Sequence, residues 1–194
     1  MTVSHIPSNA FKLGNGSLNN LGLIFIDGRS IKRIENNAFK YIPNLYSIII
    51  INTSISYIPE NAFALEIPSK DKLQKFEISL TNNPFIYPYV SNIALGAFLS
   101  FNRPTTINFR TWMNGEVEYN YLEEQIFLPF FMQNIENYLG FTFNLNCSDC
   151  RNKWIINNKY NINVRKQLIS LLACNDGNKL GHSSHFRDCR NSDD

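Results

Sequence analysis

The residues best suited to chemistry gather near the carboxyl end of the chain. All four cysteines of the 194-residue sequence lie in its last quarter: Cys147, Cys150, Cys174 and Cys189. Cys147 and Cys150 have the spacing of a zinc-binding pair, and His182 and His185 could complete a tetrahedral site. A structural zinc site normally uses two close pairs of ligands, whereas Cys174 and Cys189 lie far apart in the sequence. Two disulfides are the interpretation we favour, with zinc as the alternative, and spacing alone allows three pairings.

Outside this cluster the sequence contains no recognisable catalytic motif. It has no G-x-S-x-G elbow, no P-loop and no GxGxxG motif. The acidic pairs Glu116/Glu118 and Glu123/Glu124 are interpreted as solvated surface charges. We therefore predict that the chain is not an enzyme and that it requires no cofactor.

Composition excludes two classes of partner. The formal net charge is +2 and charged residues make up 18% of the chain, so nothing indicates nucleic-acid binding. No apolar run approaches the roughly 18 residues of a membrane-spanning helix. The first residues also lack the basic and apolar regions of a signal peptide.

A six-residue motif recurs along the chain and indicates its organisation. An aliphatic residue precedes a phenylalanine by five positions in each of these copies: Ile6–Phe11, Ile34–Phe39, Ile58–Phe63, Ile93–Phe98 and Leu122–Phe127. Recurrence every 20 to 50 residues is typical of solenoids built from stacked repeats. The copies starting at Leu21 and Leu45 agree best, because their apolar positions coincide when shifted by 24 residues.

These two repeats resemble the leucine-rich-repeat consensus LxxLxLxxNxLxxLxxxxF. The resemblance implies an α/β fold: a solenoid with a curved parallel sheet and an irregular convex side. It implies domain bounds of 1–140 for the repeats, 141–189 for a last strand and a C-terminal cap, and 190–194 for a tail. Alternate residues of each strand should point inward, and neighbouring repeats must stack to bury them.

The later repeats depart from the consensus. We expect a third repeat from Leu73 with Phe76 and Ile78 inward, followed by an insertion at 81–89 that contains two prolines. A fourth strand is expected at 106–110 with Ile107 and Phe109 inward, and a fifth at 141–145 with Phe141 and Phe143 inward. The consensus asparagine is replaced in the first three repeats, by Arg29, Thr53 and Thr81, so its hydrogen-bond ladder should be weak or replaced by threonine hydroxyls.

The cysteine-rich end resembles the C-terminal cysteine cap of extracellular leucine-rich-repeat proteins. The resemblance implies the pairs Cys147–Cys174 and Cys150–Cys189. A packing face is expected from Trp154, Ile155, Leu168, Leu171 and Leu172. Disulfides persist in oxidising compartments, so this resemblance implies a secreted or extracellular protein.

Three further features are the Ala-Phe pair of the motif, the stretch at 126–131 and Cys174-Asn-Asp-Gly. In these features the chain is similar to secreted arthropod leucine-rich-repeat proteins related to the non-catalytic subunit of Oplophorus-luciferin 2-monooxygenase. This similarity implies a non-catalytic recognition or accessory subunit. The alternative is a zinc-binding or enzymatic protein that uses the Cys/His cluster.

We predict that another protein binds the concave face. The expected outward residues of the strands are Leu23, Phe25, Asp27, Ser47, Ile49, Ile51, Lys75, Glu77, Thr106, Asn108 and Arg110. This face should be apolar toward the N-terminus and polar toward the cap.

The amino-terminal end offers a second possible contact. The chain opens inside a repeat, so we expect a truncated first repeat and an open edge there that binds a partner. Asn15 and Asn52 lie in N-x-S/T sequons and are candidate glycosylation sites, although a chain rich in Asn, Ser and Thr contains such sequons by chance.

Overall fold

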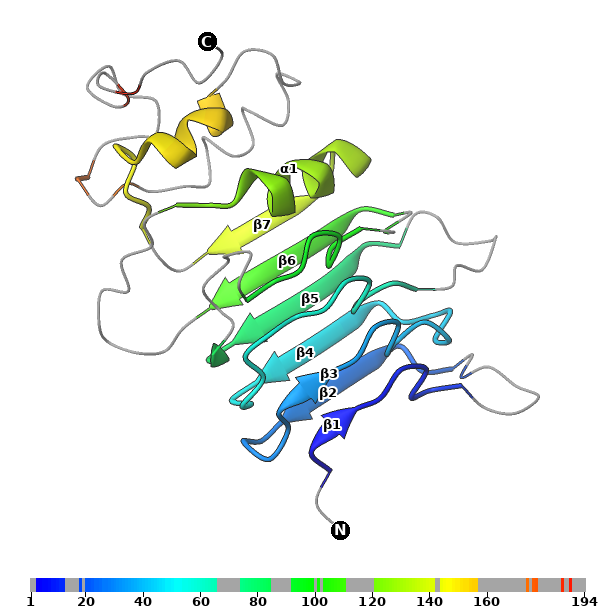
Figure 1. Cartoon of the computed structure of the whole chain (residues 1–194). Helices are drawn as coiled ribbons and strands as arrows, with labels where there is room; N and C mark the ends of the chain where they lie inside the picture. The colour runs from blue at the N-terminus through cyan, green and yellow to red at the C-terminus, as the bar shows by residue number, and fades with distance from the viewer. Residues whose placement is uncertain are drawn as a thin grey trace.

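The computed structural model describes residues 3–12, 18, 20–65, 74–84, 92–99, 101, 103–110, 121–141, 144–156, 174, 176–177, 186 and 189. Its centre is a five-stranded parallel sheet in the order β2-β4-β5-β6-β7 (Figure 1). The strands are β2 Leu23–Asp27, β4 Ser47–Ile51, β5 Phe76–Thr81, β6 Thr105–Arg110 and β7 Tyr138–Phe141. Each strand pairs with the next one along the chain, which confirms the predicted parallel-sheet solenoid.

Shorter elements flank this sheet. Strands β1 (His5–Ile6) and β3 (Arg33–Ile34) form a second, two-stranded parallel sheet from the first two motif copies. Helix α1 (Glu124–Gln133) and the 3-10 helix η2 (Cys150–Ile156) lie beyond β6 and β7 at the carboxyl-terminal end of the stack (Figure 1). No helix in the described part of the chain is long and apolar enough to cross a membrane.

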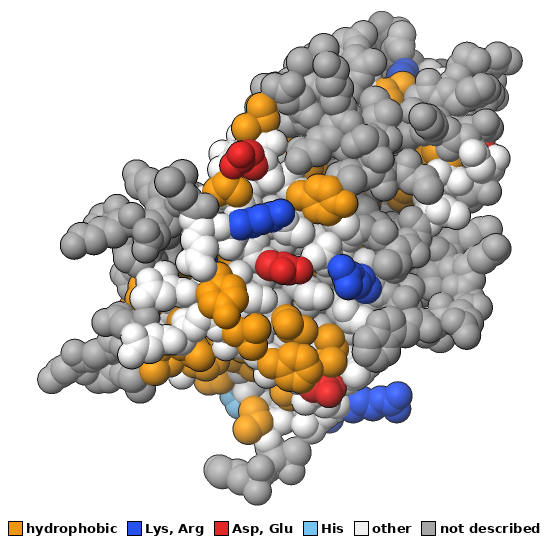
Figure 2. Space-filling view, turned by 180° about the vertical axis from the view of Figure 1, so that it is seen from behind, with side chains coloured by type: hydrophobic (Ala, Val, Ile, Leu, Met, Phe, Trp, Pro, Cys, Tyr) orange, Lys and Arg blue, Asp and Glu red, His pale blue; other side chains and the backbone are white. Residues whose placement is uncertain are grey.

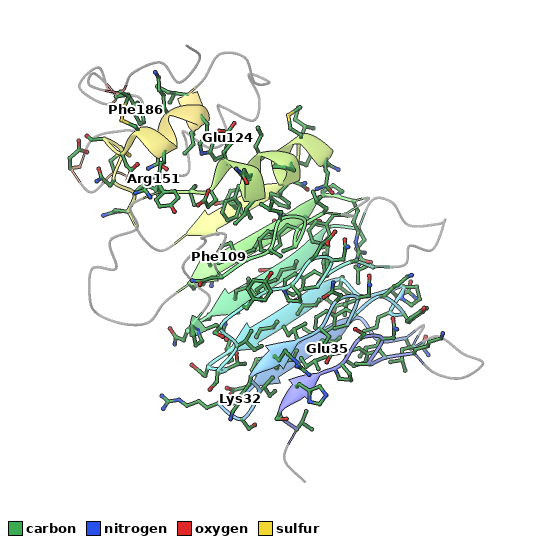
Figure 3. All side chains as sticks on the ribbon, in the orientation of Figure 1. Lys32, Glu35, Phe109, Glu124, Arg151 and Phe186 are labelled. Atoms are coloured by element: carbon green, nitrogen blue, oxygen red, sulfur yellow. A yellow bond between two sulfur atoms is a disulfide. The ribbon has the colours of Figure 1, made fainter. Side chains whose placement is uncertain are left out.

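Alternate strand residues build the core. A row of aliphatic side chains runs across all five strands in register: Ile24, Ile48, Ile78, Ile107 and Leu139. All are buried, and those beyond β2 are fully covered. Burying one such side chain contributes about 1.5–3 kcal/mol. Side chains fill the space between the sheet and the motif segments (Figure 3).

The phenylalanines of the six-residue motif form a stack parallel to the sheet. Ring centroids of successive copies are separated by 5.8 Å (Phe11–Phe39), 5.9 Å (Phe39–Phe63), 6.0 Å (Phe63–Phe98) and 6.1 Å (Phe98–Phe127). The last four rings are buried and Phe11 is partly buried. Aromatic pairs at such separations add about 0.5–1.5 kcal/mol beyond the burial of their area. The motif therefore marks one continuous aromatic row.

The fourth position of the motif has a conformational reason for its residue type. Asn9, Asn37, Asn61 and Gly96 all have positive φ, at 56°, 56°, 52° and 83°. Asparagine and glycine adopt this left-handed region most readily. The backbone N–H of each asparagine donates to the carbonyl at the same position of the next copy, at 3.1–3.3 Å. In the fifth copy Gln125 takes this position, and there the chain forms helix α1 instead.

The third repeat lies two residues later than predicted. Ile48 pairs with Ile78 and Ile50 pairs with Leu80, so the residue opposite Thr53 is Asn83 and not Thr81.

The buried Asn83 amide accepts from the Thr53 N–H (3.2 Å) and hydroxyl (2.6 Å). It donates to the carbonyls of Ile50 (2.9 Å) and Thr81 (3.0 Å). The prediction that Thr81 takes the asparagine position is therefore wrong, whereas a threonine hydroxyl, that of Thr53, does take part in the hydrogen bonding.

We expect Asn83→Ala to lower the free energy of unfolding by about 2–4 kcal/mol, because it leaves several buried polar groups without partners. Asn36→Ala, at an exposed position, is the matched control and should change it by less than about 0.5 kcal/mol. Urea denaturation followed by circular dichroism measures both. Equal effects of the two substitutions would show that the Asn83 bridge is not stabilising.

Strand β6 agrees with the prediction, whereas β7 begins earlier than predicted. Strand β6 begins at Thr105, with Ile107 and Phe109 buried as predicted. The last strand was expected at 141–145, but β7 spans Tyr138–Phe141 with Leu139 inward, and residue 143 lies outside the described part.

A buried asparagine accounts for the earlier start of β7. The Asn137 amide oxygen accepts from the Thr105 N–H at 2.9 Å, and its nitrogen donates to the Phe130 carbonyl at 2.6 Å. These bonds tie the start of β7 to both β6 and α1. The strand therefore begins directly after Asn137.

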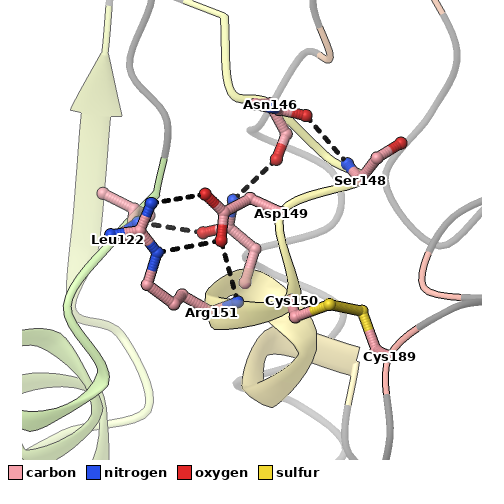
Figure 4. Close-up of polar contacts among 8 residues, drawn as sticks. Leu122, Asn146, Ser148, Asp149, Cys150, Arg151 and Cys189 are labelled. Carbon is pink, nitrogen blue, oxygen red and sulfur yellow. Dashed lines mark hydrogen bonds and ion pairs between the residues drawn. A yellow bond between two sulfur atoms is a disulfide. The ribbon is translucent and has the colours of Figure 1, made fainter.

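The cap is joined to the stack by polar bonds. The Leu122 N–H donates to the buried Asn152 amide at 2.9 Å (Figure 4). The Trp154 indole N–H donates to the Leu122 carbonyl at 3.0 Å. Trp154 and Ile155 are buried, as predicted for the packing face, whereas Leu168, Leu171 and Leu172 lie outside the described residues.

An ion pair borders this junction. Arg151 bonds the Asp149 carboxylate at 2.6 and 2.9 Å. The hydrogen bond from Arg151 lowers the pKa of Asp149. The ion pair therefore contributes to the stability of the fold above the unfolded-state pKa of aspartate. This contribution is lost as the pH falls through the lower pKa of Asp149 in the folded chain.

Two disulfides staple the cap, Cys147–Cys174 and Cys150–Cys189, with the pairing that the family resemblance implies. They differ in exposure. Cys147 and Cys174 are 1% and 2% exposed, whereas Cys150 is exposed and Cys189 is partly exposed. The sulfur atoms of the second bridge are thus more open to attack by a thiolate.

We expect a low concentration of dithiothreitol to reduce Cys150–Cys189 well before Cys147–Cys174, because exchange needs direct access to a sulfur atom. Timed alkylation followed by peptide mass spectrometry of the native protein identifies which thiols appear first. The same time course in denaturant is the control, since both bridges are then accessible. Simultaneous reduction of the native protein would contradict the difference in access.

Candidate binding face

The outer sheet face is the face opposite the motif segments, and it corresponds to the predicted concave face. Parallel register places its side chains in three rows across the strands. The first row is Leu23, Ser47, Glu77, Thr106 and Tyr138. The second is Phe25, Ile49, Ser79, Asn108 and Gly140. The third is Asp27, Ile51, Thr81 and Arg110. All eleven residues predicted for this face lie on it or, for Lys75, directly before β5.

The half of this face near the amino terminus carries an apolar patch, defined as Leu23, Phe25, Ile49 and Ile51. Leu23 is 43% exposed and Phe25 is 57% exposed, while Ile49 and Ile51 are partly exposed. Phe25 and Ile49 are direct cross-strand neighbours. Figure 2 shows hydrophobic side chains gathering on the lower part of the molecule in that view. A contiguous exposed apolar group of this kind commonly marks an interaction surface.

The other half is polar and more covered than predicted. Ser47, Thr106 and Asn108 are only 7%, 7% and 8% exposed, although the sequence pattern placed them outward. Strand alternation predicts which face a side chain lies on, but not how far that face is covered. The exposed polar residues here are Lys75, Glu77 and Arg110.

A hydrogen bond across two strands orders this polar half. The Asn108 amide donates to the Glu77 carboxylate at 3.0 Å. On the other side of Asn108 lies Gly140, where a Cβ atom would come within 2.3 Å of the Asn108 oxygen and 3.5 Å of the Tyr138 ring. The missing side chain of Gly140 therefore makes room for Asn108.

One buried group on this face lacks a partner. The Thr106 hydroxyl is the one buried side-chain oxygen or nitrogen without a hydrogen bond among the described residues. It is the cross-strand neighbour of both Glu77 and Tyr138. Leaving such a hydroxyl unpaired costs about 1–3 kcal/mol.

The charges of the face are not neutralised by one another. Asp27, Lys75, Glu77 and Arg110 all lie here, yet the ion pairs within the described residues are Arg33–Glu35 and Arg151–Asp149, both elsewhere. Asp27 accepts a long hydrogen bond from the Asn52 amide at 3.4 Å. The face therefore offers charged groups that are still available for a partner.

No protein-family model, curated protein or solved structure matches this chain.

The eleven residues predicted for this face leave out four that the register places on it: Ser79 and Thr81 of β5, and Tyr138 and Gly140 of β7. Tyr138 and Gly140 belong to β7, which was expected to begin only at residue 141. Extending the fifth strand back to include the Tyr-Leu-Gly-Phe segment would have found them, because its alternation continues that of β6.

The cysteine cluster does not form a thiolate site. All four sulfur atoms are joined in disulfides, and a disulfide sulfur is not the thiolate that binds zinc. His182 and His185 lie outside the described residues. Within the part that is described, no group of three or more His, Cys, Asp or Glu side chains could hold a metal ion.

Only one of the two candidate glycosylation sites, Asn52, lies in the described part of the chain. Asn52 is partly buried, with its amide donating to Asp27 and accepting from Asn82 at 3.3 Å. Asn15 lies outside the described residues. Glycosylation of either residue stays a prediction.

Proposed function

We propose that this chain is a leucine-rich-repeat module with a C-terminal cysteine cap that acts outside the cell as a non-catalytic protein-binding or accessory subunit. Solenoids of this kind present one extended sheet face to a partner, with the repeats serving as a rigid support. The two disulfides favour a location in an oxidising compartment, because such bridges rarely persist in the cytosol.

The observation that carries this proposal is the exposed apolar patch on a rigid sheet. Phe25 and Leu23 stand on β2 with 57% and 43% of their surface open, directly above a packed core. Large aromatic and aliphatic side chains on regular elements are the usual anchors of protein interfaces. The alternative, a zinc-dependent protein, would need thiolates that the disulfides occupy.

The test is affinity capture from extracellular fluid of the source organism with two forms of the protein. The wild type is compared with a Phe25→Ser/Ile49→Ser variant whose unfolding midpoint is checked separately. We expect a protein to bind the wild type and its affinity to fall about 100-fold or more in the variant, since two central anchors are lost. Retention of the same proteins by both forms would exclude the patch as the binding surface.

A further inference from the structure

Glu77 is a carboxylate held in one orientation on the outer sheet face. One of its oxygens accepts the hydrogen bond from Asn108 at 3.0 Å. The side chain is exposed, and within the described residues neither oxygen is paired with a cation. The second oxygen thus remains available to a donor from outside.

Gly140 stabilises this orientation indirectly. A Cβ atom there would lie 2.3 Å from the Asn108 oxygen, so only glycine lets the Asn108 amide lie where it does. Asn108 is 8% exposed and has little room to rotate. Glu77 is therefore preorganised by a chain of contacts through Asn108 to Gly140, which reduces the entropy lost when a partner binds.

The neighbouring cations are placed differently. Lys75 and Arg110 are exposed, and no hydrogen bond or ion pair holds either side chain in the described structure. Together with Glu77 and Asp27 they bring the charge of this face to zero, so net charge does not select a partner. The charged group that can discriminate between partners is therefore the one that is already ordered, the Glu77 carboxylate.

Glu77 also lies at the border of the apolar patch. Its cross-strand neighbour on β4 is Ser47, and Ile49 is the next outward residue along that strand. Diagonal neighbours of this kind are about 7–8 Å apart. Figure 2 shows an acidic side chain at the centre of the face, directly above the apolar group, and a second one at its lower edge. A single extended segment can therefore reach both features, since alternate residues of a strand are about 7 Å apart.

We propose that Glu77 binds a lysine or arginine side chain of a partner segment whose neighbouring apolar residue lies on the apolar patch. This inference rests on the proposed function and gives the chemistry of its partner. Arginine fits best, because its planar guanidinium can bond a carboxylate with two parallel N–H groups.

The test uses a phage-displayed library of random 12-residue peptides selected against the purified full chain. We expect the enriched peptides to carry an apolar residue with Arg or Lys two to four positions away. Peptides synthesised from that set should lose about fivefold or more in affinity for Glu77→Gln, the loss expected of a charge pair that is partly desolvated on binding. Glu60→Gln, an exposed carboxylate in the motif segment, is the matched control and should bind unchanged.

Reversing the charge at position 77 gives a result that a folding defect of the variant cannot imitate. Selection against Glu77→Lys should enrich Asp or Glu at the position where the wild type enriches Arg or Lys. Gly140→Ala should weaken the same basic peptides and reduce the dependence of their affinity on salt, because displaced Asn108 no longer orders Glu77. Peptides whose basic residue is replaced by norleucine should bind wild type and Gly140→Ala equally.

The outcomes separate this inference from the proposed function. Peptides that need Phe25 and Ile49 but show no basic preference would overturn the role of Glu77 and leave the binding face intact. Peptides indifferent to Phe25→Ser/Ile49→Ser would overturn both. A concentration-dependent dimer that Phe25→Ser abolishes in analytical ultracentrifugation would place a second copy on the patch, and would overturn the inference of a basic segment.

Discussion

Phe63→Ala should lower the free energy of unfolding by about 3–5 kcal/mol, the range found for buried aromatic truncations. Phe63 is fully buried and stacks on Phe39 at 5.9 Å and on Phe98 at 6.0 Å. Its loss would open a cavity in the middle of the aromatic row, where both neighbours are held by their own repeats. Chemical denaturation at two wavelengths measures the change and tests for a two-state transition.

Three further substitutions make this result specific. Phe39→Ala should cost a similar amount, whereas Phe11→Ala should cost less because Phe11 is only partly buried and has one stacking neighbour. Lys32→Ala, at an exposed position near the first repeat (Figure 3), should change stability by less than about 0.5 kcal/mol. Small and equal effects across the series would show that the motif phenylalanines are not a core element.

Removing the buried bridge by Cys147→Ala/Cys174→Ala should destabilise the protein by about 2–5 kcal/mol. The bridge closes a loop of 27 residues and its sulfur atoms are packed in the core, so both chain entropy and burial are lost. Denaturation of the oxidised protein, compared with the wild type, gives the value. A loss below about 1 kcal/mol would mean that the cap is held without this bridge.

Thiol titration and metal analysis provide the independent check on the cap. We expect no free thiol in the unfolded, unreduced wild type and no stoichiometric metal, because the four cysteines form two bridges. Cys150→Ala/Cys189→Ala is the matched variant, and it should retain the buried bridge and more of the stability. Four titratable thiols with one bound zinc would contradict the disulfide cap.

Much of the fold was predictable because its determinants are local. The alternation in β2 and β4 places Ile24, Ile26, Ile48 and Ile50 inward, and a period of two is visible in any strand with one buried face. The motif phenylalanines recur because each repeat must contribute one ring to the same row. Neither inference requires knowledge of which segments meet.

The errors arose where a segment far away in the sequence decides the register. Asn83 rather than Thr81 bridges to Thr53, although either residue could accept a hydrogen bond there. The start of β7 depends on Asn137, which bonds residues of β6 and α1. Both choices follow from buried backbone groups that need partners, and those groups become neighbours only in the folded chain.

Short-range periodicity and the need to bury apolar surface are enough to predict the repeat, the parallel sheet and the rows of inward aliphatic and aromatic residues. The same alternation predicts that Leu23, Phe25 and Glu77 lie on the outer face. The hydrogen bond from Asn108 to Glu77, and the position of Asn108 over Gly140, are visible only in the folded chain. The three residues come from three different strands, so their contact depends on strand register, which repeats of unequal length do not reveal.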